Sequence, residues 1–135
     1  MLTTMRLRES LHRELAATAA RSRRSVADIT QELLDEALRM RQCPGIYFAD
    51  ESNGRTAKIG GTGLGVWEVL RDFVGDRDVD RLRGAFPQLS EAQITGALMY
   101  YARHGEEVRA EIAENAALTP EAVAAQYPGL VRFTR

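Results

Sequence analysis

The chain has 135 residues and a mass of 15.0 kDa, with 18 basic and 19 acidic side chains, so its formal net charge is −1. Apolar residues make up 44% and charged residues 27%, which excludes a disordered chain, a collagen-like repeat and a disulfide-stapled miniprotein. The single cysteine, Cys43, cannot form a disulfide within the chain and indicates a reducing compartment. No apolar run reaches the roughly 18 residues of a membrane span, so we expect a cytoplasmic protein with no membrane partner.

The near-zero net charge hides an uneven distribution along the chain. Residues 1–24 contain six arginines and two glutamates, a balance of +4, whereas residues 25–43 carry −2 and the remainder −3. An arginine-rich N-terminus on a neutral chain indicates a local anionic partner rather than a general affinity for polyanions.

Residues 1–42 are predicted to form a first module. Residues 3–7 alternate in polarity, which predicts a short half-buried strand. The period then becomes helical from about Glu9 to Ser22, and a second amphipathic helix is predicted from an N-cap at Ser25 to about Met40. One strand and two helices in some forty residues cannot close a core, and the strand has no partner within the segment. We therefore predict a dimer in which two strands pair antiparallel and four helices bury one another.

This pattern resembles the ribbon-helix-helix repressors over residues 2–40. The resemblance is carried by Thr3, Met5, Leu7, Leu11, Leu15 and Ala19, by the turn 24–29 and by residues 32–34. The proline that is usual after the strand is replaced by Arg8, and the glycine that is usual before the second helix is missing.

The resemblance implies that the outward face of the paired strands reads base edges in the DNA major groove. It also implies that the second helix holds a phosphate at its N-terminus. The implied DNA-binding residues are Leu2, Thr4, Arg6, Arg8, Arg23, Arg24, Ser25 and Val26. The alternative is a ribbon that serves dimerisation only.

Residues 43–116 are predicted to form a second module. Residues 46–48 and 55–59 flank an Asn53-Gly54 turn and predict a β-hairpin. The glycine-rich residues 60–65 lack both the Gly-Lys-Ser/Thr ending of a P-loop and the G-x-G-x-x-G spacing, so we predict a tight loop there. Three helices are expected next: from Val66 to about Gly75, from an N-cap at Asp78 to Phe86, and from an N-cap at Ser90, with a break near Gly105. The buried stripe expected on the third helix is Ile94, Ala97, Leu98 and Tyr101.

The second module looks like a DUF433-type domain. The residues that carry this resemblance are 44–46, 61–67, 86–90, 93–94, 97–101 and 106–112. Such domains are small helix-turn-helix-like folds, similar to VapB-like type II antitoxins that are encoded beside nuclease toxins with a PIN-like fold. The resemblance implies a nuclease toxin as partner. The expected recognition helix, residues 90–97, has no arginine or lysine, so we do not expect this module to bind the DNA backbone.

Residues 117–135 are predicted to form a C-terminal tail with one short helix that starts near Thr119. Its end is apolar and flanked by arginine, and it is a candidate toxin-binding arm formed by Leu130, Val131, Arg132 and Phe133. The alternatives are a segment that packs on its own domain and the remnant of a longer chain.

No catalytic, metal-ligating or cofactor-binding constellation is recognised in the sequence. His12, His104 and Cys43 have no partners at a diagnostic spacing. The acidic residues Glu106, Glu107 and Glu111 are more typical of a solvated helix face than of a metal site. The chain is therefore predicted not to be an enzyme and to use no cofactor.

The predicted fold class is mainly α with short β elements: a ribbon-helix-helix dimer, a β-hairpin and a three-helix, helix-turn-helix-like module. The predicted function is that of an antitoxin of a type II toxin–antitoxin pair. It would be a homodimer, or a higher even-numbered oligomer, that represses transcription by binding operator DNA and neutralises a nuclease toxin. The alternatives are a free-standing ribbon-helix-helix transcriptional regulator with a protein-interaction domain, and a small nucleotide-binding enzyme that uses residues 60–65.

Overall fold

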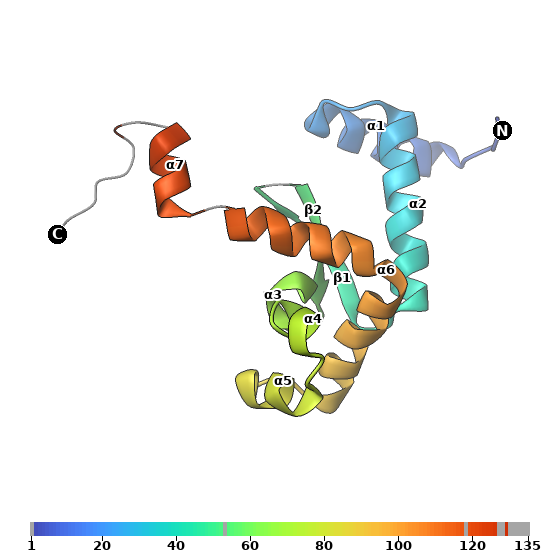
Figure 1. Ribbon diagram of the computed structural model, residues 1–135. Helices are drawn as coiled ribbons and strands as arrows, with labels where there is room; N and C mark the ends of the chain where they lie inside the picture. The colour runs from blue at the N-terminus through green and yellow to red at the C-terminus, as the bar shows by residue number, and fades with distance from the viewer. Residues whose placement is uncertain (1, 53, 118, 127–128, 130–135) are drawn as a thin grey trace. The chain divides into compact units, whose positions relative to one another are not determined.

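The protein is described from a computed structural model that covers residues 2–52, 54–117, 119–126 and 129. The chain divides into two compact units, unit 1 (Met1–Gln42) and unit 2 (Cys43–Arg135), and each has its own cluster of buried apolar side chains. The predicted class, mainly α with short β elements, is confirmed (Figure 1). Among the described helices, none combines the length and the apolar character that a bilayer crossing requires.

Unit 1 consists of two helices that cross at a steep angle, α1 (Glu9–Ser22) and α2 (Val26–Gln42) (Figure 1). Both begin where the sequence predicts, and α2 runs two residues past the predicted end at Met40. The Ser25 hydroxyl caps α2, since it accepts the Asp28 N–H at 3.1 Å. Residues 2–8, which precede α1, form neither helix nor strand in the single chain. A strand needs a partner to satisfy its backbone groups, so the predicted ribbon stays a prediction about the dimer.

The apolar interior of unit 1 is small. Among its described residues, the buried apolar side chains are Leu15, Ala19 and Ile29, and Leu7 and Val26 pack against them. Five further large apolar side chains of α1 and α2 remain exposed: Leu11, Leu33, Leu34, Leu38 and Met40. Unit 1 therefore leaves a large part of its apolar surface uncovered.

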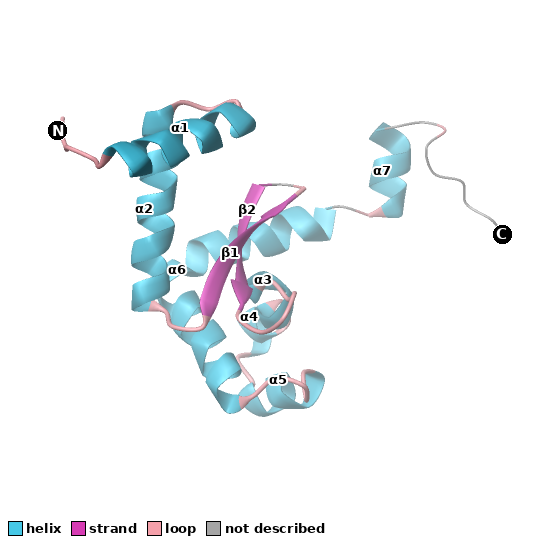
Figure 2. Ribbon diagram, turned by 180° about the vertical axis from the view of Figure 1, so that it is seen from behind, coloured by secondary structure: helices cyan, strands magenta, loops and turns pink. Residues whose placement is uncertain are grey.

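Unit 2 begins with the predicted β-hairpin, formed by β1 (Ile46–Glu51) and β2 (Gly54–Ile59) (Figure 2). The strands pair antiparallel, with Ile46 opposite Ile59 at one end and Glu51 opposite Gly54 at the other. Gly54 has a φ of +119°, a conformation that side chains with a Cβ rarely adopt. The prediction of a hairpin between two short strands is confirmed.

The helices after the hairpin follow the prediction except at one place. One helix was predicted from Val66, but the structure has two, α3 (Val66–Leu70) and α4 (Phe73–Asp76). Arg71 and Asp72 between them keep helical backbone angles, so the chain departs little from a helix there. Next come α5 (Val79–Ala85), α6 (Glu91–Ala117) and α7 (Pro120–Gln126).

Local side-chain caps explain where these later helices start. The Asp78 carboxylate accepts the Arg81 N–H at 3.1 Å at the start of α5. Ser90 and Gln93 form the predicted capping box at the start of α6, with reciprocal distances of 3.1 and 2.8 Å. The predicted break near Gly105 is found one residue earlier, at His104, whose φ of −129° and ψ of 40° are not helical.

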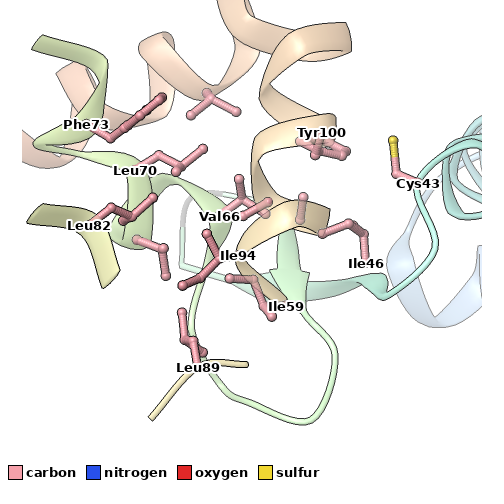
Figure 3. Close-up of a cluster of buried hydrophobic side chains, with 14 residues drawn as sticks. Cys43, Ile46, Ile59, Val66, Leu70, Phe73, Leu82, Leu89, Ile94 and Tyr100 are labelled. Atoms are coloured by element: carbon pink, nitrogen blue, oxygen red, sulfur yellow. The ribbon is translucent and has the colours of Figure 1, made fainter. Parts of the chain in front are cut away.

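The core of unit 2 lies between the hairpin and helices α3 to α6 (Figure 3). Its largest fully buried side chains are Tyr100, Ile59, Leu70, Leu82, Val66, Val69 and Val108. Tyr100 meets Phe48 of β1 edge to face, with ring centroids 6.3 Å apart. The predicted stripe on α6 is corrected at two positions: Tyr100 is fully buried in place of Tyr101, which is only partly buried, and Leu98 is also only partly buried.

Candidate nucleic-acid interface

The eight predicted DNA-binding residues lie in unit 1 at two separate places. Leu2, Thr4, Arg6 and Arg8 are exposed in the stretch before α1, and Arg23, Arg24 and Ser25 are exposed in the turn after it. Val26 differs, because its side chain packs against the small core. A helix rises about 1.5 Å per residue, so Arg8 and Arg23, at the two ends of the 14-residue α1, are separated by about 21 Å along its axis.

The N-terminal stretch and the two helices of unit 1 enclose an apolar groove with a volume of about 330 Å³. Its lining residues are Met5, Leu7, Leu11, Leu15, Thr30, Leu33 and Leu34. The one polar residue among them, Thr30, donates its hydroxyl to the Val26 carbonyl at 2.7 Å, so it adds no free donor to the groove. The groove thus offers an almost entirely apolar surface.

The turn between α1 and α2 contains a residue in an unfavourable backbone conformation. Arg23 has φ 55° and ψ 42°, the left-handed conformation that ends α1 and that glycine adopts without strain. The glycine that the ribbon-helix-helix resemblance leads us to expect before the second helix is missing from this turn.

We expect Arg23→Gly to raise the free energy of unfolding by about 1 kcal/mol and to weaken DNA binding. Removal of the strain should stabilise the turn, whereas removal of the guanidinium should delete the phosphate contact that the ribbon-helix-helix resemblance implies. Urea unfolding measures the stability, and the salt dependence of DNA binding should lose about one unit of slope.

Arg77 provides a matched control for this prediction. It also has a φ of 55°, but it lies in unit 2 at the end of α4. Arg77→Gly should raise the stability in the same way and leave DNA affinity unchanged. Equal DNA affinity of the wild type and the Arg23→Gly variant would reject the phosphate contact.

Arg24 is engaged within the chain, which changes its predicted role. Its Nη1 donates to Glu32 Oε1 at 2.9 Å, so a carboxylate already offsets its charge. The first amides of α2 have no partner within the helix and point toward the turn, as at any helix N-terminus. Arg24 is therefore a weaker candidate for a phosphate contact than its exposure alone indicates.

Most backbone amides of the glycine-rich loop, residues 60–65 of unit 2, form hydrogen bonds within the protein. The backbone amides of Gly60, Thr62, Leu64 and Gly65 all donate to oxygen atoms of the protein. Gln93 of α6 donates from Nε2 to the Gly60 carbonyl at 3.1 Å and so fastens the loop to the helix. Because a phosphate-binding loop needs amides that point outward, this geometry favours the predicted tight loop over the nucleotide-binding alternative.

Two arginines of α5 form ion pairs with carboxylates. Arg83 of α5 donates from Nε to Glu91 at 2.7 Å and from Nη1 to Asp80 at 3.0 Å. Arg81 is bonded in a similar way to Asp76. These pairs occupy the guanidinium groups nearest the start of α6, which favours a role for this region other than binding the DNA backbone.

Of the other sequence candidates, His12 is exposed on α1, and the ring of His104 lies 4.8 Å from that of Tyr100. In the described part of the chain, no three His, Cys, Asp or Glu side chains are arranged to hold a metal ion. The candidate toxin-binding residues Leu130, Val131, Arg132 and Phe133 lie outside the described residues.

Glu111 is the residue whose environment sequence reasoning missed. The sequence suggested a solvated carboxylate, but the side chain is half-buried and one of its oxygens, Oε2, is buried without a hydrogen-bond partner in the described structure. Burial and the charge of Glu107 raise the pKa of Glu111 from 4.5 to about 7. Nothing in the local sequence signals this, since the burial comes from β2, far away in the chain.

No protein-family model matches the chain, and no curated protein or solved structure matches it either.

Proposed function

We propose that the protein is a homodimeric DNA-binding repressor, and that it is the antitoxin of a type II toxin–antitoxin pair. The observation that carries the proposal is the apolar groove of unit 1, which opens beside an arginine-rich N-terminal stretch. A second copy that covers this groove would pair the two N-terminal stretches into a ribbon, and the ribbon would present its outward side chains to DNA.

A second copy is the occupant that fits the groove best. The groove includes Met5 and Leu7 of the predicted strand, so whatever covers it also meets the N-terminal stretch. A second N-terminal stretch can supply both the missing strand partner and apolar side chains of equal size. Burial of the exposed leucines of α1 and α2 in the same interface provides the driving force.

Pairing of the strands then orients the candidate DNA-binding residues. In an extended chain, successive side chains point to opposite faces. Met5 and Leu7 line the groove, so Thr4, Arg6 and Arg8 belong to the opposite, exposed face. A two-stranded ribbon fits the major groove, where arginine recognises guanine and threonine contacts base edges or methyl groups.

The antitoxin part of the proposal rests on unit 2. Its sequence resembles DUF433-type domains, and the pairing of Arg81 and Arg83 with carboxylates favours a protein partner over DNA. The toxin-binding arm at residues 130–133 is proposed from the sequence alone.

Co-expression with the product of the adjacent gene tests both parts of the proposal. We expect the two proteins to co-purify, and we expect the complex and the free dimer to shift the promoter DNA of the operon in a salt-sensitive gel assay. DNA binding without any co-purifying partner would support the free-standing regulator instead. A protein that stays monomeric and binds no promoter DNA would reject the proposal as a whole.

A further inference from the structure

We propose that the contact between β2 and the distal half of α6 is a proton-operated latch, which protonation of Glu111 tightens and ionisation of Glu111 loosens. The latch lies wholly within unit 2 and goes beyond the proposed DNA and toxin binding. Through this latch, the pH around the protein would control the position of the distal half of α6, which leads to α7.

The hinge of the latch is the break in α6 at His104. Beyond it, residues 105–117 pass beside the hairpin, with Val108 buried and Ile112 packed against the core (Figure 2). Two side-chain pairs bridge the break. Tyr100 donates its hydroxyl to Glu107, and Arg109 donates to the Tyr101 hydroxyl at 3.0 Å.

The proton-sensitive element is a row of carboxylates on the distal half of α6. Glu107, Glu111 and Glu114 are spaced by four and three residues, so they lie on one face of the helix. This face and β2 border an open surface depression of about 210 Å³, lined by Arg55, Thr56, Glu107, Ala110, Glu111 and Glu114. Glu111 lies in the middle of the row, and its buried Oε2 accepts no hydrogen bond in the described structure.

The charged groups that face Glu111 do not balance its charge in full. Glu107 and Glu114 come from its own helix and repel its ionised form. From β2, the Thr56 hydroxyl stabilises the carboxylate. Arg55, the one cation among the described residues that line the depression, is also bonded to Asp50 at 3.3 Å. Burial acts in the same direction as the repulsion and is the largest cause of the raised pKa.

The direction of the pH effect follows from proton linkage. In the docked state the pKa of Glu111 is about 7, compared with 4.5 for the free side chain, so the docked state binds more protons between these two values. Docking is therefore strongest below about pH 4.5 and weakens as the pH rises through 7. Loosening would expose the apolar side chains of Val108 and Ile112.

Hydrogen exchange of the full-length protein between pH 5.5 and 8 tests the latch. After correction for intrinsic exchange rates, the protection of amides 106–116 should fall about tenfold over this range. This is less than the full pKa difference would give, because solvent screens the half-buried Glu111. Glu111→Gln should keep the protection high and nearly independent of pH. Glu106 is an exposed carboxylate on the same helix, so the control variant Glu106→Gln should retain the tenfold fall in protection.

The proposal would be overturned if amide protection in the Glu111→Gln variant fell with pH as much as in the wild type. It would also be overturned if amide protection in the wild type did not depend on pH. If the Glu111→Gln variant fails to fold, an NMR titration of the Glu111 carboxyl group in the wild type provides the test. A titration midpoint of Glu111 near 7 supports the latch, and a midpoint near 4.5 rejects it.

Discussion

Leu33→Glu is expected to convert the dimer into a monomer and to abolish binding to operator DNA. Leu33 lines the apolar groove of unit 1 and is 42% exposed in the single chain, so the protomer can tolerate the change. In the dimer, the carboxylate would be buried without a partner, at a cost of about 4 kcal/mol, or about 1,000-fold in the dissociation constant. Analytical ultracentrifugation at micromolar concentration measures the shift.

The matched control for this variant is Met99→Glu. Met99 lies on α6 in unit 2 and is 44% exposed, close to the value for Leu33, but it is not part of the groove. We expect this variant to stay dimeric and to bind DNA normally. If Leu33→Glu also stays dimeric, the groove is not the dimer interface.

Arg6→Ala is expected to cost about 1–3 kcal/mol of specific DNA binding, because a bidentate contact from arginine to a base edge has about this value. The loss should appear as a smaller gap between the affinities for operator DNA and for a scrambled sequence. A gel-shift titration with both duplexes at one salt concentration measures this gap.

Arg13→Ala is the control for a general loss of positive charge in unit 1. Arg13 lies on α1, with its side chain 75% exposed and paired with Glu9 at 3.5 Å. Its removal should leave the gap between operator and scrambled DNA unchanged. A similar loss of discrimination in both variants would mean that Arg6 contributes charge and does not read a base.

Much of the fold could be predicted because its signals are local. The caps at Ser25, Asp78 and Ser90 each depend on residues three positions apart, and the structure has all three. The hairpin and the break near Gly105 are likewise encoded by short runs of sequence. The division of residues 66–76 into α3 and α4 was missed, and the structure offers no physical reason for it.

The properties missed by sequence reasoning depend on contacts between distant residues. The choice of Tyr100 over Tyr101 as the buried ring depends on Phe48 of the hairpin, because both tyrosines fit a helical period. Glu111 is half-buried because Thr56 and Arg55 lie opposite it. Arg24 could be recognised as an exposed cation, but its pairing with Glu32 required the geometry of the turn. The predicted ribbon requires a second chain and stays a prediction.

The small interior of unit 1 has a consequence for the lifetime of the protein in a cell. With Leu15, Ala19 and Ile29 as its buried apolar side chains in the described residues, the first unit gains little stability from its own packing. In the proposed dimer, association would supply much of the folding free energy, and by mass action this contribution would shrink on dilution. A newly synthesised monomer would therefore be susceptible to proteases until it dimerises. The cellular concentration of the protein would then determine the lifetime of each chain.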